Sequence, residues 1–429
     1  MLLVSCLAFS LLSTPVFADD DADRDDRWPS WRGPLATGVA VGDAYPTTWD
    51  NQTNVLWKVP MQDIGGSTPA VWDDLIFVTA NRDEKNVLIC LDWNGEIQWS
   101  QELGGKRKGE HQKGTGCNPS PVTDGQFVFA YYKSGDLGCF NFMGELVWKR
   151  NLQEDFSEDT LWWDLGTSPV LSKDYLIIAC VQSPPSYLVA FDKATGEVAW
   201  KVDRNLEAPK EANQTYSTPQ VINYDGEEQL IVLGADHVTA HRVKDGSEIW
   251  RVGGLNPTQN GFFRSIASPV VCDSMVVAPY ARGNSLTGIK LGGEGDVTDT
   301  HVKWSFGGND RRPMAADVPT PIVHDHRILI CGDKGTIMCR NLESGELLWE
   351  DRLGRGTFSS SPVLAGNLVY FTREDGTTFV FKAEDGLEVV AENELGEYTV
   401  ATPVFSHGRI LIRTFENLYC IGTDKTSSQ

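Results

Sequence analysis

The most complete copy of the chain's recurring turn reads Asp192-Lys193-Ala194-Thr195-Gly196-Glu197-Val198-Ala199-Trp200. Gly196 supplies the positive φ that a tight hairpin needs, and the side chains of Asp192 and Thr195 can bond their own backbone. Residues 187–192 before the turn are β-rich, and the chain continues as a strand over 197–200. The stretch therefore predicts a β-hairpin that joins the third and fourth strands of a small sheet.

The same signals recur along the chain with regular spacing. Fourth-strand signals end at Trp57, Trp99, Trp148, Trp200, Trp250, Trp304, Trp349 and, in degenerate form, Val389. First-strand signals place a proline before an apolar pair, at Pro69, Pro121, Pro169, Pro219, Pro269, Pro321, Pro362 and Pro403. Consecutive prolines of this series are 41 to 52 residues apart. A period of about 40 to 50 residues is typical of β-propeller blades.

Each kind of signal occurs eight times, but the two series are offset. Trp57 precedes every first strand, and nothing after Cys420 provides a fourth strand. The strand at about residues 54–59 should therefore complete the last blade, which closes the ring and removes free sheet edges. The sequence predicts an all-β fold, an eight-bladed β-propeller of four-stranded antiparallel blades over residues 49–422.

The turn signature also points to a family. The Asp-x-x-Thr-Gly-x-x-x-Trp step, whole at residues 192–200 and partial elsewhere, resembles the tryptophan-docking motif of quinoprotein-type (PQQ-like) β-propeller repeats. The resemblance covers about residues 49–422. In that family each tryptophan stacks between neighbouring blades, and a large flat ring with one N–H donor suits that position. The resemblance implies this docking role for Trp57, Trp99, Trp148, Trp200, Trp250, Trp304 and Trp349.

The two ends of the chain differ from the repeats in composition. Residues 1–18 are apolar and end in Val16-Phe17-Ala18, which resembles a signal peptide with a small-residue cleavage site. We expect an acidic tether and an N-terminal rim segment over residues 19–48 and a disordered tail over 423–429. No later segment is long and apolar enough to cross a membrane. The prediction is a periplasmic or secreted bacterial protein, either soluble or held by a lipid anchor.

Charge and cysteine content limit the possible partners. The 429-residue chain has a formal net charge of −22 and no basic run, so nucleic acid is not an expected partner. Cys90, Cys139, Cys339 and Cys420 occupy the third-strand position that Ala190 fills in another copy, which favours packing over disulfides. No cysteine or histidine pattern indicates a metal site.

Candidate binding residues lie in the loops that precede the first strands, because in propellers these loops surround the mouth of the central channel. The candidates are Trp163, Asp164, Tyr216, Phe263, Arg264, Arg312, Asp317, Phe358 and Tyr398. Aromatic rings together with arginine suit a planar or anionic ligand, or an extended peptide. The alternative is that these loops are polar by default and that their aromatic rings plug the channel.

The expected function is that of an exported, noncatalytic binding or scaffold propeller. It would bind a protein or peptide through the channel mouth and blade loops, as a monomer or within a heteromeric assembly, without a cofactor. The compact repeats are similar to the noncatalytic branch of the family, which includes the propeller lipoprotein of the barrel-assembly machinery.

Two enzymatic alternatives remain open. The first is a PQQ- and calcium-dependent dehydrogenase. Such enzymes hold calcium with Glu and Asn, use an Asp base and often carry adjacent cysteines, and this sequence has no Cys-Cys pair. The second is a polysaccharide-acting enzyme, which would need two carboxyl groups, such as those of Asp317 and Glu397, in one cleft.

Overall fold

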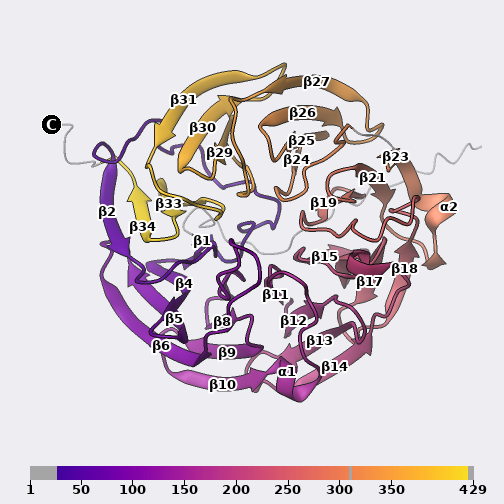
Figure 1. Ribbon diagram of the computed structural model, residues 1–429, viewed down its shortest axis with the longest axis horizontal. Coiled ribbons are helices and arrows are strands. Elements are labelled where there is room, and N and C mark those ends of the chain that lie inside the picture. Colours follow the sequence, from indigo (N-terminus) through magenta and orange to yellow (C-terminus); the bar gives the residue numbers. More distant parts are fainter. Residues whose placement is uncertain (1–26, 309–311, 424–429) are drawn as a thin grey trace, which may run out of the picture.

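Eight β-sheets are arranged around a central axis like the blades of a propeller (Figure 1). The structure is a computed structural model that describes residues 27–308 and 312–423. The described residues confirm the predicted all-β, eight-bladed architecture. The expected signal peptide, residues 19–26 of the expected tether and residues 424–429 of the expected tail lie outside the described residues.

The first four blades follow each other along the chain. Blade 1 contains β1 (Arg27–Trp28), β3 (Ala70–Trp72), β4 (Leu75–Arg82), β5 (Lys85–Asp92) and β6 (Ile97–Gly105). Blade 2 contains β7 (Val122–Thr123), β8 (Phe127–Tyr131), β9 (Asp136–Asn141) and β10 (Leu146–Asn151). Blade 3 contains β11 (Val170–Leu171), β12 (Tyr175–Cys180), β13 (Tyr187–Asp192) and β14 (Val198–Asp203). Blade 4 contains β15 (Gln220–Tyr224), β16 (Glu227–Gly234), β17 (His237–Arg242), β18 (Glu248–Val252) and β22 (Gly295–Asp296).

The remaining blades complete the circle. Blade 5 contains β19 (Val270–Cys272), β20 (Met275–Tyr280), β21 (Ser285–Lys290) and β23 (Val302–Gly307). Blade 6 contains β24 (Ile322–His324), β25 (Arg327–Cys331), β26 (Thr336–Asn341) and β27 (Leu347–Arg352). Blade 7 contains β28 (Val363–Ala365), β29 (Leu368–Thr372), β30 (Thr377–Lys382) and β31 (Glu388–Glu394). Blade 8 contains β32 (Val404–Ser406), β33 (Arg409–Arg413), β34 (Asn417–Ile421) and β2 (Val55–Pro60), and the short helices are α1 (Leu152–Asp155), η2 (Lys210–Asn213) and α2 (Thr298–His301).

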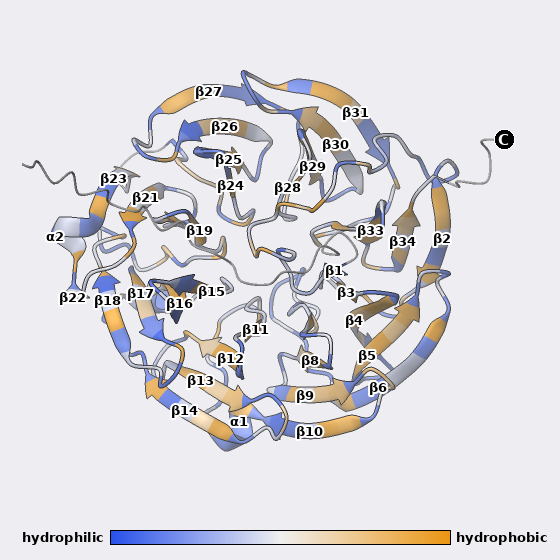
Figure 2. Ribbon diagram, turned by 180° about the vertical axis from the view of Figure 1, so that it is seen from behind, coloured by the Kyte–Doolittle hydropathy of each residue, from blue (hydrophilic) through white to orange (hydrophobic). Residues whose placement is uncertain are grey.

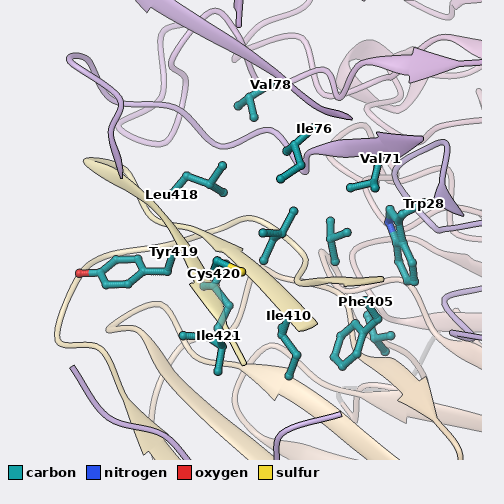
Figure 3. Packing of buried hydrophobic residues seen from close by; sticks show 14 of the residues in the cluster. Trp28, Val71, Ile76, Val78, Phe405, Ile410, Leu418, Tyr419, Cys420 and Ile421 are labelled. Atoms are coloured by element: carbon teal, nitrogen blue, oxygen red, sulfur yellow. The ribbon is translucent and has the colours of Figure 1, made fainter. Parts of the chain in front are cut away.

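The N-terminal strand closes the ring as predicted. β2 pairs antiparallel with β34, with Trp57 opposite Cys420 and Val59 opposite Leu418. Blades 8 and 1 then pack face to face, and Figure 3 shows Val71 and Ile76 of blade 1 facing Ile410 of blade 8. This closure joins the two ends of the propeller by backbone hydrogen bonds as well as by apolar contact.

The position of a strand in its blade determines its pattern of burial. The four central residues of β12 are all buried, because neighbouring blades cover both faces of the inner strands. On β14, the outermost strand of the same blade, most residues are exposed or half-buried and Trp200 is buried. Figure 2 shows the same mixture of hydrophobic and hydrophilic stretches along the outermost strands. The core therefore lies between the blades.

A closed belt of hydrogen bonds surrounds the channel. In every blade the residue before the repeat proline is Ser or Thr, and its backbone N–H donates to the hydroxyl of the corresponding residue in the next blade, over 2.9 to 3.2 Å. The last bond runs from Thr402 to Thr68 and completes the circle. The belt consists of Thr68, Ser120, Ser168, Thr218, Ser268, Thr320, Ser361 and Thr402.

Six of the seven predicted docking tryptophans donate a hydrogen bond to a carbonyl of the next blade. For example, Trp200 Nε1 donates to the carbonyl of Val243 at 2.7 Å, and its ring lies over Gly246 so closely that a Cβ there would come within 2.6 Å. The other five donors are Trp57, Trp99, Trp148, Trp304 and Trp349. Small third-strand residues stand opposite these rings, as Cys90 does for Trp99 and Ala190 for Trp200.

Trp250 is the exception among the seven. It is completely buried, and its Nε1 has no hydrogen-bond partner among the described residues. The chain between β21 and β23 is longer than the usual turn, and β22 within it pairs in parallel with β18 at Trp250. The insertion therefore covers the ring from outside and gives blade 4 a fifth strand.

Candidate binding site at the channel mouth

A cavity of about 490 Å³ opens at one end of the central channel. All eight blades contribute to its wall, through the loops that lead into the innermost strands. Representatives, from blade 1 to blade 8, are Gly66, Lys113, Trp163, Tyr216, Arg264, Asp317, Ser359 and Val400. The location agrees with the expectation that these loops surround the channel mouth.

The N-terminal segment contributes Trp31 to the same cavity. Trp31 Nε1 donates to the hydroxyl of Thr402 in the hydroxyl belt at 3.3 Å. The guanidinium of the neighbouring Arg32 is buried and donates to the carbonyls of Pro362, Thr37 and Pro321. Burial lowers the pKa of Arg32 to about 9.

This position differs from the rim placement that we expected for the segment. β1 pairs with β3, the innermost strand of blade 1, and Val39 bridges to Leu364 at the innermost strand of blade 7. The innermost strands offer unpaired backbone groups toward the channel, and the segment satisfies some of these groups. Trp31 therefore lines the cavity, whereas Trp28 is buried in the core between blades 8 and 1.

A buried carboxylate organises one side of the cavity. Glu211 is 1% exposed and accepts a hydrogen bond from Trp163 Nε1 at 2.8 Å. Arg282 Nη2 donates to both carboxylate oxygens of Glu211, and Arg264 Nε lies 3.4 Å from one of them. Arg264 Nη1 also donates to Asp317 at 2.7 Å. Two arginines and one indole are thus held in fixed positions around the mouth.

Asp164 is the second buried carboxylate of the cavity. Its oxygens accept hydrogen bonds from the side chain of Asn118 at 2.9 Å and from the N–H of Leu165 at 2.7 Å. Burial raises the pKa of Asp164 to about 6, although hydrogen bonds from Leu165 and Gly116 and the charge of Lys133 act in the opposite direction. The group therefore changes its charge near neutral pH.

His111 and Lys113 line the neighbouring part of the wall. The His111 ring contacts Trp163 edge to face, with ring centroids 6.1 Å apart. Burial lowers the pKa of His111, and the positive charges of Lys113 and Arg264 lower it further. Lys113 Nζ is paired with Glu374 and also donates to Ser359 at 3.0 Å. The imidazole is therefore neutral at pH 7.

The structure brings together five of the nine candidate residues from the sequence: Trp163, Asp164, Tyr216, Arg264 and Asp317. The other four lie elsewhere. Phe358 is completely buried and stacks on Phe371, and Phe263 packs against the core between blades 4 and 5. Arg312 is exposed and pairs with Glu350, and Tyr398 donates to Glu374.

Trp31, Asn118 and Arg282 are among the cavity residues that sequence analysis did not select. Arg282 belongs to the connection between β20 and β21, the second and third strands of blade 5. It lines the cavity because the connections between second and third strands lie at the same end of the channel as the entrance loops. Counting both kinds of loop would have found it. Nothing local in the sequence indicates that residues 28–32 enter the channel.

The carboxylates of the cavity do not suit the calcium ion that a quinone-dependent enzyme would hold. Calcium takes 6 to 8 oxygen ligands, and no group of three or more His, Cys, Asp or Glu residues that could hold a metal occurs within residues 27–308 and 312–423. Glu211 and Asp317 instead face arginines. The residues of the cavity therefore do not fit a quinone held by calcium.

The pair of carboxyl groups suggested for a polysaccharide-acting enzyme does not share this cavity. Asp317 lines it, whereas Glu397 lies outside it and is held by Lys58, Tyr419, Thr414 and Asn417. Burial alone would raise the pKa of Glu397, but these four hydrogen bonds lower it to about 2. Glu397 is therefore ionised and fully engaged within blade 8 and its entrance loop.

The repeats match a protein-family model described as outer membrane protein assembly factor BamB, over residues 94–286 and 299–390. The chain belongs to this family. A curated relative, the outer membrane protein assembly factor BamB of Francisella tularensis, is 20% identical over 152 residues. That alignment covers 35% of this chain and 32% of the relative, so the match spans about a third of the relative's length.

Solved structures show the same fold at low identity. BamB from Moraxella catarrhalis has a TM-score of 0.60 and 13% identity, with 86% of this chain and 99% of that chain covered. Quinohemoprotein alcohol dehydrogenase from Comamonas testosteroni has a TM-score of 0.68 and 12% identity, with 95% and 82% covered. In the part of the chain that the structure describes, no helix has the length and apolar character needed to span a bilayer.

Proposed function

We propose that this member of the BamB family is an exported, noncatalytic binding propeller that holds a protein or peptide segment at the channel mouth. One observation carries the proposal: eight blades build one cavity of about 490 Å³, and its charged groups are already paired with each other. Paired groups orient a ligand and provide specificity. A cavity of this size fits a few side chains of an extended segment.

The exposed aromatic rings of the entrance loops favour a polypeptide partner. Trp162, Trp163, Phe262 and Tyr398 are between 37% and 52% exposed, although they are large and apolar. Tryptophan, tyrosine and arginine are enriched among residues that dominate protein-binding energies. The name of the family, an assembly factor for outer membrane proteins, agrees with a polypeptide partner in the cell envelope.

A thermal-shift screen tests the proposal. The full chain is heated with three ligand sets: unstructured peptides containing tryptophan, soluble oligosaccharides, and PQQ together with calcium. We expect peptides alone to raise the melting temperature, and we expect Trp163→Ala to remove the rise. The control Trp93→Ala changes a half-buried tryptophan that does not line the cavity, and it should retain the rise. A rise with PQQ and calcium, or with oligosaccharides but not peptides, would contradict the proposal.

A further inference from the structure

The acidic groups in and behind the cavity wall already accept hydrogen bonds from donors of the protein. Glu211 accepts hydrogen bonds from Trp163 and Arg282, and Asp317 accepts one from Arg264. Asp164 is engaged by Asn118 and by the backbone of Leu165. A cationic ligand would therefore meet carboxylates that are already partly neutralised by the donors of the protein.

The donors of the cavity, in contrast, are only partly used. Arg264 is 9% exposed, and its Nη2 forms no hydrogen bond with any described residue. Arg282 uses Nε and Nη2, which leaves Nη1 without an acceptor within the described ranges. A guanidinium carries five N–H donors, so both arginines retain N–H groups for a ligand.

His111 adds a further donor on the same side. Its Nδ1 accepts a hydrogen bond from the backbone N–H of Lys113 at 3.2 Å, so the proton of the neutral ring resides on Nε2. The pKa of His111 is lowered by burial and then by Lys113 and Arg264, which means that the ring senses more positive than negative charge nearby. The neutral ring can therefore donate its Nε2 proton to a negative group placed beside Lys113 and Arg264.

The net charge of the whole chain does not oppose such a ligand at close range. The formal charge of −22 is distributed over 429 residues. At physiological ionic strength the Debye length is about 8 Å, so distant surface carboxylates are screened and the ligand meets mainly the N–H groups of the wall that remain free. Charge-assisted hydrogen bonds from arginine to a carboxylate are about twice as strong as neutral ones.

We propose that the channel mouth recognises a carboxylate of the bound peptide through Arg264, Arg282 and His111, with Trp163 packing beside it. The carboxylate belongs either to an Asp or Glu side chain or to the free C-terminus of the segment. This inference rests on the proposed function and specifies the chemistry of its partner.

Three matched octapeptides test the inference by fluorescence anisotropy with the full chain. Each contains one tryptophan. The first has a central Glu and a C-terminal amide, the second has Gln and an amide, and the third has Gln and a free C-terminal carboxylate. We expect the first or the third peptide to bind about tenfold more tightly than the second, a difference of about 1.4 kcal/mol. The tighter of the two identifies the source of the carboxylate.

Two variants and one control test whether the preference for a carboxylate arises at the channel mouth. Arg282→Gln and His111→Gln should each reduce the preference to less than about threefold, since glutamine lacks the charge and length of arginine and does not place a donor where the imidazole Nε2 lies. His111→Gln leaves the formal charge unchanged at pH 7. Lys303→Gln on β23, an exposed residue of an outermost strand, removes the same charge as Arg282→Gln far from the cavity and should keep the full preference.

The outcomes separate the two proposals. Equal binding of the three peptides, or an unchanged preference in both Arg282→Gln and His111→Gln, would overturn the carboxylate inference and leave the peptide-binding function standing. Absence of binding by all three peptides would overturn both. Melting curves of each variant show whether the fold is retained before affinities are compared.

Discussion

At the scale of single residues, a tryptophan on the outermost strand connects six of the eight blades to the next blade by a hydrogen bond. Trp200 is 8% exposed, its indole donates to the carbonyl of Val243, and its ring rests on Gly246. The contact requires a flat ring on one blade and a residue without a Cβ on the next. This explains why the Gly-x-x-x-Trp spacing, rather than overall hydrophobicity, is the most informative part of the sequence.

Trp200→Ala should lower the free energy of unfolding by about 3 to 5 kcal/mol, because it removes a buried ring and leaves a cavity between two blades. Urea denaturation followed by circular dichroism measures the change. The matched control is Trp162→Ala, which removes an indole that is 43% exposed, and it should change stability by less than about 0.5 kcal/mol. A similar loss in both variants would show that Trp200 does not fill an interblade gap.

Asp164 should give the protein a distinctive dependence of stability on pH. Burial raises its folded-state pKa to about 6, above the value of about 3.9 for an unfolded chain. The cost of ionising it is therefore fully present above pH 6 and disappears as the pH falls toward 4. Relative to Asp164→Asn, the wild-type chain should gain stability over this range, as measured by urea unfolding at each pH.

Asp192→Asn provides the control with the opposite sign. Backbone and side-chain hydrogen bonds from Thr195 lower the pKa of Asp192. Its contribution to stability is thus present above the unfolded pKa of about 3.9 and is lost as the pH falls further. A flat difference between wild type and Asp164→Asn from pH 7 to pH 4 would show that Asp164 titrates normally.

The candidate site was only partly predictable at this scale. Of the residues that were selected by their position in an entrance loop, five line one cavity in the structure, namely Trp163, Asp164, Tyr216, Arg264 and Asp317. It could not tell which side chains of a loop face the axis, and Phe358 instead turns into the core to stack on Phe371. An aromatic ring in an entrance loop can either be buried between blades or be exposed in the channel. The sequence pattern does not give the conformation of the loop, so it cannot predict which of the two positions the ring takes.

At the scale of elements, ring closure could be predicted from the sequence. The signals for fourth strands begin before the first signal for a first strand, and counting the two kinds of signal does not require knowledge of loop conformation. The additional strands were not predictable. β22 consists of two residues in a glycine-rich stretch that reads as a loop, and β1 is equally short. Both pair with strands that are remote in sequence, and such contacts leave no local pattern.

Removal of β2 should open the propeller. A chain that begins at residue 62 lacks residues 55–60, so the edge of β34 and the apolar surface around Cys420 and Leu418 become exposed. We expect a lower melting temperature and self-association by size-exclusion chromatography, because an exposed sheet edge pairs with other chains. The shortened chain also lacks β1 and the segment that follows it, so a synthetic peptide of residues 27–61 should restore both properties, and the same peptide with Trp57→Ala should restore them less well.

At the scale of the whole molecule, the hydroxyl belt explains why a Ser or Thr precedes each repeat proline. The belt satisfies one backbone N–H per blade where the eight blades converge on the channel. At the junction of blades 8 and 1, the hydrogen bond from Thr402 to Thr68 closes the belt. This bond joins the two ends of the propeller in addition to the pairing of β2 with β34. The Ser or Thr of each repeat thus provides both the N–H donor to one neighbouring blade and the hydroxyl acceptor for the other.

Thr218→Val tests the belt. The substitution preserves shape but leaves the N–H of Ser168 without its acceptor, so it should cost about 1 to 3 kcal/mol of unfolding free energy. Thr218→Ser retains the hydroxyl, and serine occupies this position in four other blades, so this control should stay within about 1 kcal/mol of wild type. Hydrogen exchange of the Ser168 amide should accelerate in Thr218→Val alone. Equal stability and exchange in both variants would show that water replaces the lost hydroxyl, and that the belt does not stabilise the ring.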